Sequence, residues 1–188
     1  GRLPSAYEET TVSTSFAAGL RVGIALQWLS RACGLTIAAD NIMADGYMGE
    51  MHVSDVSVAT ALEGLLKSST SVGFELETVD GCVLLRSQQN QSRRDPFLNG
   101  GDLAPAQADD LAREVDVVLP LPPRRPDAID LRQRALPLEA VAPSLAQQLG
   151  VPVRYDAAVR EFPVNPAAFT GVPLRTAMNL LVRQWPVS

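Results

Sequence analysis

The chain has 188 residues, of which 46% are hydrophobic, and a formal net charge of −5 at pH 7. An acidic chain with scattered arginines, paired only at Arg93-Arg94 and Arg124-Arg125, is not expected to bind nucleic acid. No apolar run reaches the ~20 residues that a membrane-spanning helix requires. The chain opens with Gly-Arg-Leu-Pro instead of Met, so we expect a processed or trimmed N-terminus, and a missing export signal excludes nothing.

An internal repeat organises the sequence. Residues 21–67 align without a gap on residues 137–183, at a constant offset of 116. Identical residues coincide at Leu29/Leu145, Gly34/Gly150, Asp40/Asp156, Thr60/Thr176, Ala61/Ala177 and Leu65/Leu181. A repeat of this length indicates one small folding unit used twice. The first copy continues into residues 72–87, whereas the second stops at Ser188, just after its second helix.

The first unit, residues 12–87, has the predicted order β-α-β-β-α-β-β. Apolar residues at three- and four-residue steps predict two helices, the first stopped by Gly34 and the second capped by Ser57. Asp40-Asn41 is expected to form a turn, and Asp80-Gly81 a tight hairpin turn. The expected strands span residues 14–18, 35–39, 48–56, 74–77 and 82–86.

A polar, proline-rich linker, residues 88–126, separates the units and contains a possible short helix over residues 105–115. The second unit, residues 127–188, is expected to contain strands over residues 129–136, 151–155 and 162–172. Its first helix has Pro137 in the first turn, and its second spans residues 174–183; Pro143 should bend the first helix or mark its true start.

These patterns predict an α+β fold in which each unit packs two helices on one face of a small mixed sheet. The second unit is expected to lack its final hairpin. The leucines expected to be buried are Leu26, Leu29, Leu62, Leu65, Leu145, Leu149, Leu174 and Leu181.

The missing hairpin leaves the second sheet with an edge that must stay unpaired or borrow a strand. We take Phe169, Thr170 and Val172 as the candidate partner-binding edge. Two segments could cover it: residues 12–16, and residues 115–121 with Val115, Val117 and Leu119. We favour residues 115–121, because a short loop can return this segment to the second unit.

No catalytic or metal-binding constellation is evident. The single histidine, His52, lies on an expected strand without a neighbouring nucleophile or a second ligand at metal-binding spacing. The carboxylate pairs Glu8-Glu9 and Asp109-Asp110 are sequence neighbours and do not face one cleft. Asp40 and Asp156 are explained as turn residues. We therefore expect no enzyme activity, no cofactor, no metal and no small-molecule substrate; a small enzyme is the third-ranked hypothesis.

Cys33 and Cys82 allow two interpretations. They are either two small buried apolar side chains or one disulfide within the first unit, and the disulfide would indicate an oxidising compartment. A bridge would close a loop of about 50 residues and stabilise the chain by about 3–4 kcal/mol.

The repeated pattern resembles a known family. Residues 16–22 (FAAGLRV), 25–30 (ALQWLS), 33–37 (CGLTI) and 58–66 (VATALEGLL), with Asp40, are similar to the short N-terminal domain of secretins and TonB-dependent transducers. Segments of the second copy are similar too, at residues 136–141 (LPLEAV), 149–153 (LGVPV) and 169–181 (FTGVPLRTAMNLL), with Asp156. Together they cover roughly two thirds of the chain.

The resemblance implies a non-enzymatic periplasmic docking module, associated with the outer membrane in the full-length protein. In secretins such domains form homo-oligomeric rings that meet inner-membrane or periplasmic proteins of a secretion or type IV pilus machine. In transducers they dock a periplasmic anti-sigma regulator. We expect the secretin or pilus-type role, with the transducer signalling domain or its regulator as the alternative. A transducer should run from a single such domain into a TonB box and a plug, whereas here a second unit follows.

Overall fold

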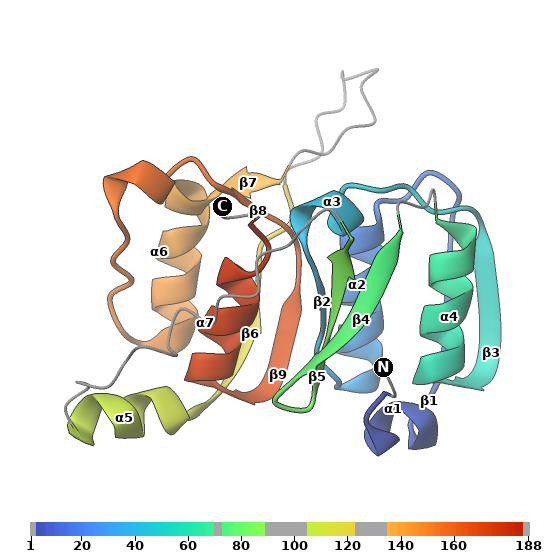
Figure 1. The fold of residues 1–188 in the computed structure, drawn as a ribbon, viewed down its shortest axis with the longest axis horizontal. Coiled ribbons are helices and arrows are strands. Elements are labelled where there is room, and N and C mark those ends of the chain that lie inside the picture. Colours follow the sequence, from blue (N-terminus) through green and yellow to red (C-terminus); the bar gives the residue numbers. More distant parts are fainter. Residues whose placement is uncertain (1–2, 70–72, 89–104, 123–134, 186–188) are drawn as a thin grey trace.

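The computed structural model describes residues 3–69, 73–88, 105–122 and 135–185 (Figure 1). Its architecture is α+β with several small sheets, as predicted. The first half of the linker and most of the strand expected over residues 129–136 lie outside the described residues.

The first unit occupies the blue-to-green half of Figure 1. Its elements are α1 (Ser5–Glu9), β1 (Thr11–Phe16), α2 (Val22–Cys33), β2 (Ile37–Ala39), α3 (Asn41–Ala44), β3 (Met51–Ser57), α4 (Val58–Ser68), β4 (Phe74–Val79) and β5 (Cys82–Ser87). The second unit occupies the yellow-to-red half. Its elements are α5 (Pro105–Ala112), β6 (Glu114–Val118), β7 (Leu136–Pro137), α6 (Leu138–Leu149), the short 3-10 helix η1 (Ala157–Val159), β8 (Pro163–Val164), β9 (Ala168–Pro173) and α7 (Leu174–Val182).

Local signals place most helix ends and turns correctly. The Ser57 hydroxyl accepts a hydrogen bond from the Thr60 amide at 3.2 Å, which confirms the predicted cap. Gly34 and Gly150 end α2 and α6 in the left-handed conformation, with φ of 72° and 67°. The prediction of a simple turn at Asp40-Asn41 is wrong, because Asp40 caps the short helix α3 and Asn41 is its first residue. Its carboxylate can satisfy the free amides of a helix start, and the chain continues helically.

Each unit was expected to contain one mixed sheet, but the first unit contains two. β1 and β3 form an antiparallel pair, and β2, β5 and β4 form a separate mixed sheet in the order β2-β5-β4. In that sheet β5 is central, parallel to β2 and antiparallel to β4. The hairpin of β4 and β5 is confirmed, with Asp80 and Gly81 both at positive φ in its turn.

The second unit is less complete. β6 pairs with β9, and the short β7 pairs with β8. The strand expected over residues 151–155 is not formed, and the one expected over residues 162–172 is split into β8 and β9. Pro143 lies inside α6, which starts at Leu138, so this proline does not mark the helix start.

The β2-β5-β4 sheet serves both units. All six residues of β5 are buried, so neither face of this strand is solvated. Leu85 belongs to the core of the first unit, with Leu29 and Leu62. Leu84 belongs to a second core, with Phe169 and Leu145 of the second unit. The two units are therefore joined through opposite faces of one sheet.

Polar contacts, buried at Gln27 and partly buried elsewhere, reinforce this junction. The Gln27 side chain of α2 donates to the carbonyls of Leu119 (2.7 Å) and Ala167 (3.1 Å). The Thr176 hydroxyl of α7 donates to the Asp80 carboxylate at 2.7 Å. Arg183, also from the second unit, forms an ion pair with Glu77 of β4.

Seven of the eight leucines expected to be buried are buried: Leu26, Leu29, Leu62, Leu65, Leu145, Leu149 and Leu174. The eighth, Leu181, is only half-buried, whereas its repeat counterpart Leu65 is fully buried. The difference arises because Leu181 lines an open groove.

Candidate functional site

The predicted pairing at the edge of the second unit is present. Val115 pairs with Val172, and Val117 pairs with Phe169, in the antiparallel β6–β9 ladder. Leu119 continues the contact, because its amide donates to the Ala167 carbonyl at 2.9 Å. Val115, Val117, Leu119, Phe169 and Val172 are all buried.

The reason given for that pairing needs correction. β6 does not take the place of the final hairpin that the second unit was expected to lack; it is the counterpart of β1. The β1–β3 ladder pairs Val12 with Val56, and has its irregularity between Val12 and Thr14. The β6–β9 ladder repeats this arrangement, with an irregularity between Val115 and Val117.

The outer edges of this small sheet are also engaged. The Gln148 side chain of α6 accepts from the Val118 amide (2.8 Å) and donates to the Val118 carbonyl (2.9 Å). On β9, the exposed Thr170 donates its amide to the Thr36 hydroxyl at 3.0 Å. The candidate partner-binding edge of Phe169, Thr170 and Val172 is therefore used within the chain.

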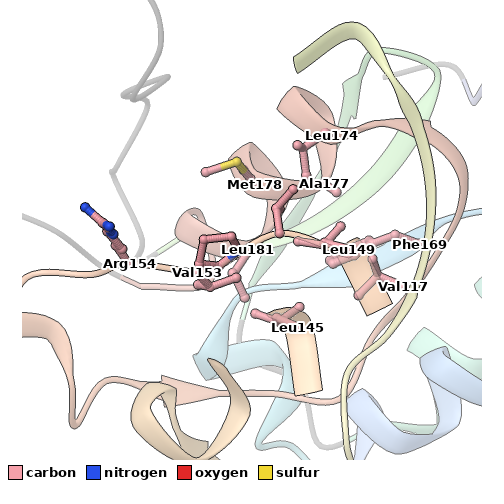
Figure 2. A pocket seen from close by; sticks show the side chains of 12 residues that line it. Val117, Leu145, Leu149, Val153, Arg154, Phe169, Leu174, Ala177, Met178 and Leu181 are labelled. Carbon is pink, nitrogen blue, oxygen red and sulfur yellow. The ribbon is translucent and has the colours of Figure 1, made fainter. Parts of the chain in front are cut away.

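Among the described residues, the second unit has no counterpart of the β4–β5 hairpin, and a groove lies open between α6 and α7. The groove has a volume of about 300 Å³, and apolar side chains from both helices and from the β6–β9 sheet point into it (Figure 2). Lining residues include Val117, Leu145, Leu149, Phe169, Ala177 and Leu181. Residues 151–154 form its rim, and Met178 is 38% exposed there.

The repeat explains why this groove is open. At the offset of 116, its lining residues Leu145, Ala177 and Leu181 correspond to Leu29, Ala61 and Leu65, which lie in the closed core of the first unit. Met178 corresponds to Leu62, which is 1% exposed. In the first unit β2 and β5 complete this core. The second unit has no equivalent strand among the described residues.

The sequence analysis did not predict this groove. The expected lack of a final hairpin was interpreted as an unpaired edge of the second sheet, whereas in the structure the α6–α7 helix pair is the part without a covering strand. A sequence signal did exist: Ile37-Ala38-Ala39 of β2 is replaced by Val153-Arg154-Tyr155, and an arginine is out of place in a strand buried on both faces.

The two cysteines are free thiols in the structure, so the disulfide interpretation is not the arrangement observed. Cys33 is half-buried at the end of α2, and Cys82 is buried on β5. Burial raises the pKa of Cys82 to about 11 and also raises the pKa of Cys33.

We predict that Cys82 in the folded protein resists alkylation by iodoacetamide near pH 8, because little thiolate is present. Titration of the unreduced, denatured protein should find two thiols per chain; fewer would indicate the bridge.

The raised pKa of Cys82 means that the folded state holds the thiol proton more tightly than the unfolded state. The free energy of unfolding should therefore fall as pH rises from about 9 towards 11, as measured by urea unfolding.

Within the part of the chain that the structure describes, no group of three His, Cys, Asp or Glu side chains is placed to hold a metal ion. His52 is exposed on β3. Asp40 and Asp156 both cap helical turns: Asp40 accepts from Met43, and Asp156 accepts from Ala158. None of the described helices has the length and apolar character needed to cross a bilayer.

Comparison of the chain with protein-family models, with curated proteins and with solved structures finds no match.

Proposed function

We propose that this chain is a non-enzymatic docking module that joins other proteins in the periplasm, as part of a secretin or type IV pilus-type assembly. The observation that carries this proposal is the open apolar groove between α6 and α7, whose counterpart in the first unit is filled by protein. Apolar surface of this kind is stabilised by association with another macromolecule.

The chemistry of the groove favours a protein partner over a small substrate. Small-molecule sites combine apolar walls with a few convergent polar groups that orient the ligand. Of the residues that line this groove, Arg154 alone carries a charged side chain, and it lies at the rim. The alternative role, as a signalling domain of a TonB-dependent transducer or its regulator, would use the same surface.

The proposal is tested by tagging the full-length protein at its chromosomal locus, cross-linking intact cells and separating their membranes. We expect the protein in the outer-membrane fraction, in a ring-sized homo-oligomer that also contains inner-membrane or periplasmic proteins. A monomer in the cytoplasmic fraction would overturn the proposal. The coding sequence downstream separates the two roles, since a channel domain indicates a secretin and a plug domain indicates a transducer.

A further inference from the structure

The two units contain equivalent two-stranded ladders, each with a helix beside its outer edge. In the β1–β3 ladder Ser15 pairs with His52, and in the β6–β9 ladder Val118 pairs with Ala168, the repeat counterpart of His52. The matching register directs the main-chain N–H and C=O of Ser15 away from β3, as it directs those of Val118 away from β9. α2 packs against β1 as α6 packs against β6.

The second unit closes this outer edge with a side chain. The Gln148 carboxamide of α6 accepts from the Val118 amide (2.8 Å) and donates to the Val118 carbonyl (2.9 Å). The Ser144 hydroxyl, one turn earlier, accepts a further hydrogen bond from Gln148 at 3.1 Å. The carboxamide therefore makes both of the bonds that one residue of an antiparallel strand would make with Val118.

The first unit leaves the same edge open. At the offset of 116, Ala32 stands in place of Gln148, and Trp28 stands in place of Ser144. Ser15 and Ala32 are both exposed. Among the described residues, Ser15 has no hydrogen-bond partner outside its own ladder, and an alanine side chain can supply none. Unpaired N–H and C=O groups at a strand edge are the groups to which another chain adds by main-chain pairing.

Trp28 places a large apolar side chain beside the open edge. Its side chain is 48% exposed, and its ring centroid lies 6.4 Å from that of Phe16, the residue that follows Ser15. Tryptophan is enriched among the residues that dominate binding between proteins, because its large flat ring is buried on association. The open edge thus has an apolar contact next to it.

Arg31 gives this surface a positive charge. It is exposed and lies three residues after Trp28, so that both side chains are on one side of α2. Among the described residues it forms no ion pair. Its counterpart in the second unit is the neutral Gln147. An acidic partner segment is therefore favoured here over a basic one.

We propose that the outer edge of β1 at Ser15 binds an extended, acidic segment of a partner protein by antiparallel pairing. One residue of this segment makes with Ser15 the two main-chain bonds that Gln148 makes with Val118 in the second unit. An apolar side chain of the segment covers Trp28, and a carboxylate lies beside Arg31. This site is separate from the groove between α6 and α7, so the inference goes beyond the proposed function.

Hydrogen exchange on the 188-residue protein tests whether the edge is open. After correction for intrinsic rates, the Ser15 amide should exchange at least about tenfold faster than the Val118 amide, because Gln148 protects only the latter. Ala32→Gln copies the carboxamide into the first unit and should slow exchange at Ser15, and Gln148→Ala should speed exchange at Val118. A Ser15 amide that is already protected in the parent protein would mean that this edge is covered, and would overturn the inference.

The binding probe is a short fluorescent peptide that alternates threonine and valine between two terminal glutamates, and its binding is measured by anisotropy. We expect saturable binding that Ala32→Gln weakens about tenfold or more, because the introduced carboxamide occupies the edge. Trp28→Ser, which introduces the residue of the second unit, should weaken binding similarly. Ala140→Gln makes the same change at an exposed alanine of α6 and is the matched control, with no effect expected.

Two further peptides test the main-chain and the charge contacts. The same peptide N-methylated at every residue keeps its side chains but has no main-chain donor, and should bind about tenfold more weakly or worse. A peptide with lysines in place of the glutamates should bind about threefold more weakly than the acidic one, and Arg31→Glu in the protein should reverse this order.

Absent binding, equal binding of the N-methylated peptide, tighter binding of the lysine peptide to the parent, or unchanged binding to Ala32→Gln would overturn the inference. A protein that dimerises alone and becomes monomeric with Ala32→Gln would assign the edge to a second copy and also overturn it. Binding that Met178→Glu abolishes would place the peptide in the groove, with the same consequence. Binding lost with Ala32→Gln, together with a cytoplasmic monomer in cells, would uphold this inference and overturn the proposed function alone.

Discussion

Replacing Asp40 by alanine is expected to lower the free energy of unfolding by about 4 kcal/mol, because two buried main-chain amides lose their acceptor. The Asp40 carboxylate is fully buried and accepts from the amides of Met43 (2.8 Å) and Ser87 (2.7 Å). It therefore joins the start of α3 to the end of β5. Hydrogen bonds to a charged group contribute about 1.5–3 kcal/mol each.

Asp156, the repeat counterpart of Asp40, supplies the matched control. Its carboxylate is exposed and accepts from one amide, that of Ala158, at 2.8 Å. Asp156→Ala should cost about 1 kcal/mol, as for an ordinary helix cap. Urea unfolding followed by far-ultraviolet circular dichroism measures both variants. Equal losses would mean that the second contact of Asp40, with β5, adds no stability.

Leu84→Ala is expected to cost about 3 kcal/mol and to destabilise both units together. Leu84 is fully buried against the second unit, although its strand belongs to the first. The neighbouring Leu85 is buried in the first core, so Leu85→Ala removes a similar volume on the opposite face. Leu121→Ala makes the same chemical change at an exposed site and should alter stability by less than about 0.5 kcal/mol.

The two units should unfold in one transition, because they share the β2-β5-β4 sheet. In a Trp28→Phe background, Trp185 reports on the second unit by fluorescence, and circular dichroism reports on the whole chain. The two curves should coincide in the parent and in both Leu84→Ala and Leu85→Ala. A transition of Trp185 that shifts alone in Leu84→Ala would show that the units unfold independently.

The internal repeat, the main helices and several of their ends were determined by the sequence alone. Helical periodicity placed Leu29 and Leu145 in cores, and Ser57 and Gly34 marked helix ends, because these effects act within a few residues. The apolar run of residues 115–121, which lies just upstream of the second unit, was correctly paired with the segment that contains Phe169 and Val172, although β6 corresponds to β1 and not to the hairpin.

Only the tertiary structure decided what covers each apolar face. Cys82-Val83-Leu84-Leu85 is apolar throughout, which indicates burial on both faces, but does not say that the second face belongs to the other unit. The groove between α6 and α7 was hidden for the same reason. Helical periodicity shows that Ala177 and Leu181 need apolar neighbours, but the helix pattern does not encode which strand supplies them. In the first unit β5 packs on the corresponding helix face. The described part of the second unit has no counterpart of β5. Burial is a property of neighbours in space, and neighbours in sequence carry little information about it.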